Sequence, residues 1–385
     1  MSANPHAYLS DPEQARATES IERLDEAGRF YHMTCAYDYE ALPQALLAKL
    51  GAGCSTFVAP NTAGEHLLCR NYDFSHFLHN DRHNPRTGVN VVVESASPKA
   101  RYRSLGVCDA FWLDYEHGTF AEGSLDDGVT DISALALAPY VCMDGVNERG
   151  LGVSVMQLSP VATEWEEIPY EGWEGRLTYG IEPLVLEEPG EVPAPDYIRA
   201  APDFVAVNRT DRRAWVAHPE MFRTTMPGKP CVLPPVMMRM MLDGCADVGE
   251  AVAVADSLNI TATGPGPAYH ILVADRTGAS RLLEWVDNSM NVIDASHATN
   301  FRVSADDGFH GVCQRDECIK AGLARFAKGG MREDYAQSLL KLVSQDAATG
   351  NDHSKTQYSC IYNLDRLTLR AFAFGDFTRS WDFAL

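Results

Sequence analysis

The chain of 385 residues is poor in positive charge, with 32 Lys and Arg against 53 Asp and Glu and a formal net charge of −21. Proteins bind polyanions mainly through Lys and Arg, so this balance argues against nucleic acid and acidic membrane surfaces as partners. No run of about 18 apolar residues occurs, and the opening residues lack a basic stretch followed by an apolar run. We therefore expect a cytoplasmic protein.

Motifs for disulfides, metals and phosphates are also scarce. The ten Cys residues are scattered, without the dense spacing of a disulfide scaffold, which predicts reduced and mostly buried thiols. No Gly-rich phosphate loop or internal repeat is evident. His76, His79 and His83 could meet on a helix and bind zinc, but a solvated loop is the better interpretation, and Cys313 and Cys318 have a poor spacing for zinc. We expect no metal and no organic cofactor.

Short strand patterns make up much of what is present. Residues 1–30 are polar and helix-prone, and a short helix is expected over "EALPQALLAKLGAGC". Residues 1–53 are therefore interpreted as a separate leader. Strands follow as "STFVAP", "HLLCRNYDF", "GVNVVVESA" and the pair "DGVNERG" and "LGVSVMQL". Residues 159–229, which are rich in Pro, Glu and aromatics, are interpreted as an insertion in a single domain over residues 54–385.

Paired helices interrupt the strands. The segments "LPPVMMRMMLDGC" and "DVGEAVAVADSL" are expected to be neighbouring helices, the second with a capping box formed by Asp247 and Glu250. Two more helices are predicted over residues 312–328 and 333–345. Between these pairs, "YHILVADRTGASRLLEWV" and "MNVIDASHATNF" each predict a strand pair, and "YSCIYNLDRLTLRAFAFG" predicts a closing hairpin. Antiparallel runs with paired helices indicate an α+β fold with helix-covered sheets.

Cys54 is the candidate nucleophile. A thiol attacks as the thiolate, and its reference pKa of about 8.5 means that it needs a nearby base or positive charge. If "STFVAPNTAGEHLLCRNYD" closes as a hairpin, Cys54, Arg70 and Asp73 meet at one end of it. Taken alone, Cys54 could instead be a buried core thiol, and Arg70 with Asp73 a structural ion pair.

The segments "GCSTF" and "CRNYDF" resemble the choloylglycine hydrolase family of linear amide C–N hydrolases, which are N-terminal nucleophile hydrolases. Bile salt hydrolases and penicillin V acylases belong to that family. The resemblance continues through "DGVNERGLGVSV", "ATNF", "QRDECIKAGL" and "TQYSCIYNLDRLTLRAF", and covers most of residues 54–385 apart from the insertion. It implies a four-layer αββα sandwich of two antiparallel sheets, and a possible homotetramer.

The resemblance also implies a mechanism. Self-processing would break the Gly53–Cys54 bond of a zymogen, and Cys54 would then be the nucleophile, with its own α-amine as the general base. An α-amine titrates near pH 8, which suits proton transfer at neutral pH. Arg70 would stabilise the thiolate, and Asp73 would hold the amine in position.

The resemblance assigns roles to three further residues. Asn300 would donate its side-chain amide to the oxyanion, and Arg315 would orient the nucleophile from a helix start. Gln157 stands where bile salt hydrolases have Asn and penicillin V acylases have Tyr; it keeps an amide donor but reshapes the pocket. We therefore expect an amidohydrolase that cleaves a small N-acyl amide through a thioester. The alternatives are an acyltransferase that uses the same thioester and a non-catalytic binding protein on the same fold.

Overall fold

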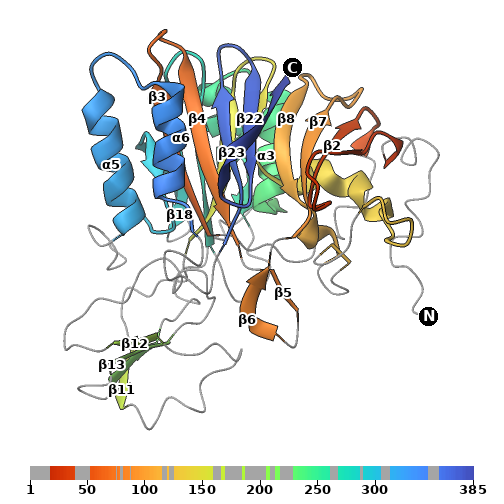
Figure 1. Ribbon diagram of the computed structural model, residues 1–385. Coiled ribbons are helices and arrows are strands. Elements are labelled where there is room, and N and C mark those ends of the chain that lie inside the picture. Colours follow the sequence, from red (N-terminus) through yellow and green to blue (C-terminus); the bar gives the residue numbers. More distant parts are fainter. Residues whose placement is uncertain are drawn as a thin grey trace.

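The computed structural model describes residues 18–39, 53–74, 76–78, 81–86, 88–114, 119–120, 125–158, 166–169, 184–186, 205–208, 213–216, 229–260, 268–286, 289–304, 313–345 and 355–385. Two large sheets dominate these residues (Figure 1). Sheet A has nine strands in the order β1 (Glu22–Arg23), β2 (Phe30–Cys35), β7 (Asn90–Ser95), β8 (Ser104–Asp109), β9 (Cys142–Asn147), β10 (Gly152–Leu158), β17 (Ala268–Ala274), β18 (Ser280–Val286) and β19 (Ser289–Asp294). Its neighbours pair antiparallel, except β2 with β7.

Sheet B is antiparallel throughout and packs against one face of sheet A. Its six strands run in the order β20 (His297–Ala298), β3 (Gly53–Pro60), β4 (His66–Asp73), β21 (Thr356–Asn363), β22 (Thr368–Ala373) and β23 (Asp376–Ala384). The hairpins predicted over β3–β4, β9–β10, β17–β18 and β21–β22 are therefore confirmed.

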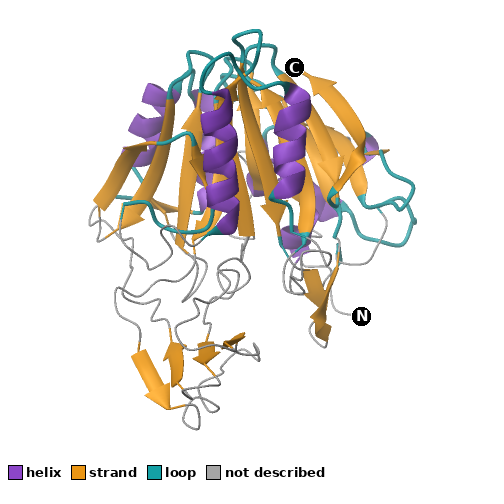
Figure 2. Ribbon diagram, turned by 60° about the vertical axis from the view of Figure 1, so that its left-hand side comes forward, coloured by secondary structure: helices purple, strands orange, loops and turns teal. Residues whose placement is uncertain are grey.

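Helices cover the two outer faces. Helices α3 (Pro234–Gly244) and α4 (Val248–Asp256) pack on sheet A, and α5 (Gln314–Phe326) and α6 (Glu333–Leu342) pack on sheet B. Figure 2 shows helices in front of the strands and behind them. Two 3₁₀ helices, η4 (Ala110–Asp114) and η5 (Ser133–Val141), lie between strands of sheet A along the chain. The four-layer αββα sandwich is confirmed.

Local sequence explains how these helices begin. Pro234 and Pro235 occupy the first turn of α3, where a missing N–H costs no hydrogen bond. Asp247 caps α4 by accepting a bond from the Glu250 N–H at 3.0 Å, as the capping box predicts. The Glu250 carboxylate bonds back to the Ala246 N–H at 2.8 Å, one residue before the cap.

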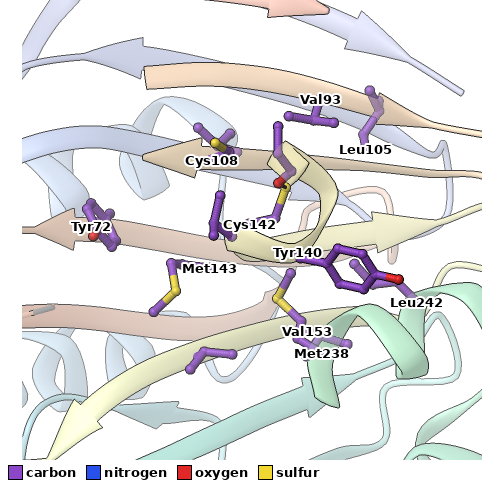
Figure 3. Packing of buried hydrophobic residues seen from close by; sticks show 14 of the residues in the cluster. Tyr72, Val93, Leu105, Cys108, Tyr140, Cys142, Met143, Val153, Met238 and Leu242 are labelled. Carbon is purple, nitrogen blue, oxygen red and sulfur yellow. Dashed lines mark hydrogen bonds between the residues drawn. The ribbon is translucent and has the colours of Figure 1, made fainter. Parts of the chain in front are cut away.

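The main hydrophobic core lies between the sheets and extends under α3. Figure 3 shows Tyr72 of β4 near Cys108 and Met143 of sheet A, with Val153 and Met238 packed beyond them. A second core cluster fills the space between sheet B and helices α5 and α6. Eight of the nine Cys side chains that the structure describes are buried free thiols.

Part of the expected leader, residues 1–53, lies in sheet A, and removal of the leader stays a prediction. Strands β1 and β2 both belong to this sheet, and β2 pairs with β7 along its whole length, from Phe30 opposite Asn90 to Cys35 opposite Ser95. Phe30, Tyr31 and Met33 expose none of their surface. The partner strand lies far along the chain, so no local turn in the sequence reveals this pairing. The helix expected up to residue 54 falls largely outside the described residues.

Other segments also differ from the sequence prediction. The segment "MNVIDASHATNF" does not form a strand pair, because β19 belongs to sheet A and β20 to sheet B. His76 and His83 lie on paired short strands, β5 (His76–Leu78) and β6 (Asp81–Arg86), so they are neither in the expected loop nor on one helix. His79 lies outside the described residues.

The remaining strands form small sheets. Strands β11 (Glu166–Pro169), β12 (Leu184–Leu186), β13 (Val205–Asn208) and β14 (Arg213–Val216) fall inside the predicted insertion and make a sheet of their own, apart from sheets A and B in Figure 1. Strand β15 (Cys231–Val232) pairs with β16 (Asn259–Ile260). Within the described part of the chain, no helix is both long and apolar enough to cross a membrane.

Candidate active site

The β3–β4 hairpin brings Cys54 and Arg70 together as predicted. Side chains alternate along a strand, so Cys54 and Thr56 face sheet A, while Phe57 faces the helices. Cys54 stands opposite Tyr72 in the antiparallel register, which makes Arg70 a diagonal neighbour on the same face. A side chain as long as Arg spans such a diagonal easily.

The Arg70 guanidinium contacts the sulfur directly. Its Nη2 lies 2.8 Å from Cys54 Sγ, and its Nη1 donates to Ser154 Oγ at 2.5 Å. Its Nε lies 2.9 Å from Asp144 Oδ2, and none of these side chains is exposed. Because an Arg side chain stays charged in proteins, it presents a permanent positive charge to the sulfur.

Asp144 balances that buried charge, and sequence reasoning missed it. Its carboxylate accepts bonds from the Tyr358 hydroxyl at 2.7 Å and from the Tyr362 hydroxyl. A buried charge without such partners would cost several kcal/mol. Asp144 and Ser154 lie in the segment "DGVNERGLGVSV", but nothing in the sequence shows that they face a strand of the other sheet.

Asn300 reaches Cys54 because the chain crosses from sheet A to sheet B between β19 and β20. Strand β20 pairs antiparallel with β3, with Ala298 opposite Thr56, so residue 300 falls beside residue 54. The Cys54 main-chain N–H donates to Asn300 Oδ1 at 2.9 Å. Asn300 Nδ2 donates to the Gln157 carbonyl oxygen at 2.6 Å.

Arg315 joins Asn300 to Asp73. It is the second residue of α5, which agrees with the predicted helix start, and it is buried. Its Nη2 donates to Asn300 Oδ1 at 2.6 Å and its Nη1 to Asp73 Oδ2 at 2.8 Å. Asp73 Oδ1 also accepts a bond from the Thr356 hydroxyl at 2.6 Å. The structure thus connects the predicted site residues in one network around the Cys54 nitrogen and sulfur.

Gln157 takes part in this network through its main chain. Ser154, on the same strand, points at Arg70, and alternation along β10 places the Gln157 side chain on the opposite face of the sheet. The Gln157 carbonyl oxygen accepts the bond from Asn300. The oxyanion role of the Gln157 side-chain amide stays a prediction, as do the catalytic roles of the other site residues.

Burial controls the ionisation of the Cys54 thiol. Cys54 exposes none of its surface, and this burial raises the pKa of its thiol to about 11, although the Arg70 charge lowers it. The Asp73 carboxylate raises the pKa further, whereas the Asp73 main-chain N–H and Arg315 lower it. At neutral pH the site therefore holds a protonated thiol beside a fixed positive charge.

Within the described residues, no cluster of three or more His, Cys, Asp and Glu side chains is arranged to hold a metal ion. The polar atoms around Cys54 are guanidinium, amide, hydroxyl and carboxylate groups that bond to one another. This donor and acceptor set fits nucleophilic chemistry at the sulfur.

No protein-family model and no curated protein matches the chain. Similar solved structures include penicillin V acylase from Agrobacterium tumefaciens, at 12% identity and a TM-score of 0.44, covering 83% of each chain. Two variants of conjugated bile acid hydrolase from Clostridium perfringens are also similar, at 12% and 13% identity and TM-scores of 0.45 and 0.40. Each covers 86% of this chain and 92% of its own.

Proposed function

We propose that the chain is a cysteine N-terminal nucleophile amidohydrolase with Cys54 as the nucleophile. The observation that supports this most is that both reactive atoms of Cys54 have a separate buried partner. Its sulfur lies 2.8 Å from Arg70 Nη2, and its nitrogen lies 2.9 Å from Asn300 Oδ1. A core thiol does not need a guanidinium at hydrogen-bond distance, and an ordinary strand N–H does not need a side-chain acceptor.

Processing would create the catalytic amine. In the proposed step the Cys54 sulfur attacks the Gly53 carbonyl carbon, and the thiol proton passes to the leaving nitrogen. The C–N bond breaks, a thioester forms, and water then releases the Gly53 carboxylate and restores the thiol. Since Cys54 is fully buried before this step, the proposal requires cleavage to precede substrate binding.

Catalysis would then use the freed amine as the base. The amine accepts the thiol proton, the sulfur attacks the carbonyl carbon of an N-acyl amide, and the proton passes to the departing amine product. Arg70 stabilises the sulfur anion, and the second N–H of the Asn300 amide is available to the oxyanion. Water attacks the thioester to release the acid. Asn300 Oδ1, which Arg315 also contacts, would hold the amine in place.

Mass spectrometry of the purified protein tests the proposal. We expect the wild type to yield a chain that begins at Cys54, whereas Cys54→Ala stays intact from residue 1 to 385. The cleaved wild type should hydrolyse at least one of penicillin V, glycocholate and N-lauroylglycine, and Cys54→Ala none. An intact wild type without hydrolysis would favour a binding protein, and cleaved Cys54→Ala would exclude Cys54 as the attacking group.

A further inference from the structure

Another buried pair of a basic and an acidic side chain joins β17 to β18. His270 and Glu284 stand directly opposite each other on these strands, and neither side chain is exposed. His270 Nδ1 lies 2.9 Å from Glu284 Oε1. Such a pair is expensive to bury unless its remaining donors and acceptors have partners, so those partners indicate what it does.

The partners lie on both sides of Asn300. His270 Nε2 lies 2.8 Å from the Thr299 carbonyl oxygen. On the other side, the Glu284 carboxylate accepts bonds from the Val303 N–H at 2.9 Å and from the Ser304 N–H at 2.8 Å. The Ser304 hydroxyl adds a bond to Glu284 Oε2 at 2.6 Å. One ion pair therefore holds the backbone both before and after Asn300.

The segment that carries Asn300, residues 299–304, lies outside the regular hydrogen-bond ladders. Strand β20 ends at Ala298, and residues 299–304 belong to neither a helix nor a strand. Both ring nitrogens of His270 lie within hydrogen-bond distance of oxygen atoms, so the ring links the Glu284 carboxylate to the Thr299 carbonyl. Bonds that involve ionised groups are shorter and stronger than neutral ones, which suits them to fix a segment outside the regular ladders.

We propose that His270 and Glu284 are positioning residues that fix the backbone of Asn300 so that its side-chain oxygen meets the Cys54 nitrogen. This inference rests on the proposed function, because it assigns the pair to the same site. Arg315 and the Gln157 carbonyl orient the Asn300 amide group, whereas His270 and Glu284 hold the main chain that carries it. Both supports are needed, since a displacement of about 1 Å can cost about 100-fold in rate.

Glu284→Ala tests the role of the pair. Its loss leaves the Val303 and Ser304 N–H groups without their acceptor, and we expect kcat per cleaved chain to fall about 10- to 100-fold, with little change in KM. Glu284→Gln should keep most of the activity. Its carbonyl oxygen can still accept from the backbone, and its amide can donate to Nδ1 of a neutral His270 ring that still bonds to Thr299.

Asp243→Ala is the matched control. Asp243 is also the carboxylate of a buried ion pair, with Arg239 at 2.6 Å, and it accepts a bond from the Tyr39 hydroxyl at 2.8 Å, but it does not contact residues 299–304. Both alanine variants should lower the melting temperature, and only Glu284→Ala should lower kcat. Equal kcat values in the two folded variants would overturn the inference and leave the proposed function intact.

A double-mutant cycle with Asn300→Ala separates positioning from general destabilisation. If Glu284 acts through Asn300, Glu284→Ala should reduce kcat in the wild-type background and change it less than about 2-fold once Asn300 is absent. The same fold-loss in both backgrounds would overturn the inference. If Asn300→Ala has no measurable turnover, the comparison of kcat between Glu284→Ala and Asp243→Ala decides whether Glu284 has a positioning role. A wild type that neither cleaves itself nor hydrolyses a probe would instead refute the proposed function.

Discussion

The Arg70 guanidinium lies between the Cys54 sulfur and the Asp144 carboxylate, with its Nη2 2.8 Å from the one and its Nε 2.9 Å from the other. All three groups are fully buried. Asp144 offsets the Arg70 charge, and the Tyr358 and Tyr362 hydroxyls donate to the Asp144 oxygens. The fixed geometry leaves one donor of the guanidinium aimed at the atom that we propose to become an anion.

Arg70→Lys should lower turnover about 100-fold. A Lys ammonium is a compact charge on a flexible stem. It cannot replace the planar guanidinium, which donates to Cys54 and Ser154 while its Nε lies beside Asp144. The charge is kept, so a loss of activity reports on geometry rather than on charge alone. The measurements are kcat with a hydrolysed probe and the extent of Gly53–Cys54 cleavage.

Arg239→Lys is the control for that substitution. Arg239 is another buried Arg, which bonds to Ser95 and Ser104 and pairs with Asp243, away from the site. We expect a similar loss of melting temperature and unchanged kcat. An Arg70→Lys enzyme with the activity of the control would show that the guanidinium shape is not needed.

The pH dependence of stability should report on Glu284. Burial raises its pKa, but the bond and charge of His270 and the Ser304 hydroxyl outweigh this and lower the pKa from 4.5 to about 2. A carboxyl with a lowered pKa stabilises the fold above pH 4.5, and this contribution is lost as the pH falls toward 2. The shift corresponds to about 3 kcal/mol in total, of which about 1 kcal/mol is lost by pH 4.

Carboxyl ¹³C NMR of Cys54→Ala between pH 7 and pH 3 measures this shift directly, and the resonance that disappears in Cys54→Ala with Glu284→Gln assigns Glu284. Both chains stay uncleaved. We expect the Glu284 carboxyl to stay ionised through pH 4, where an ordinary Glu is already largely protonated. A midpoint near pH 4.5 would mean that the pKa of Glu284 is the same in the folded and unfolded chains.

The sequence was sufficient to predict contacts between residues that are close along the chain as well as in space. The β3–β4 hairpin has a clear turn, so the meeting of Cys54 with Arg70 follows from its register. The Asp247 cap and the four helices likewise depend on local residues. The likeness of "ATNF" and "QRDECIKAGL" to family motifs drew attention to Asn300 and Arg315, and the structure brings both to Cys54.

The sequence was insufficient to predict contacts that depend on how the two sheets face each other. Asp144 and Ser154 meet Arg70 only because β9 and β10 of sheet A lie opposite β4 of sheet B. His270 and Glu284 read as polar residues within apolar strands, and their link to Thr299 depends on the crossing between β19 and β20. Neither arrangement has a period or a turn signal in the sequence.

Gly150→Ala should destabilise the β9–β10 hairpin that carries Asp144 and Ser154. Gly150 has a φ of +80°, and a Cβ there would lie 2.3 Å from the Leu364 carbonyl oxygen. The left-handed backbone alone costs a non-Gly residue about 1–2 kcal/mol, and the clash with a strand-end carbonyl adds to it. We expect a total loss of more than about 3 kcal/mol in the free energy of unfolding, measured in urea.

Gly128→Ala isolates the clash. Gly128 has a similar φ of +70°, but a Cβ there meets no atom within 4 Å. It should therefore lose only the backbone contribution of about 1–2 kcal/mol. Equal losses for the two substitutions would mean that the Leu364 segment moves away at little cost.

Residues 18–39 should remain bound after the Gly53–Cys54 bond is cut. Fully burying a large apolar side chain stabilises a fold by about 1.5–3 kcal/mol, so Phe30, Tyr31 and Met33 together contribute on the order of 5–9 kcal/mol. That is comparable to the whole stability of a typical domain, about 5–15 kcal/mol. Cleaved protein should therefore show two pieces on a denaturing gel and a single peak in gel filtration.

A chain that begins at Cys54 tests the same point from the other side. Without β2, it exposes the backbone edge of β7 and the apolar surface that Phe30 and Tyr31 cover, so we expect it to be insoluble or to melt far below the cleaved protein. Supplying residues 18–39 as a separate peptide during refolding should restore the fold, because the strand needs no covalent link to pair with β7. A wild-type melting temperature for the shortened chain alone would mean that β1 and β2 are dispensable, as a removable leader would be.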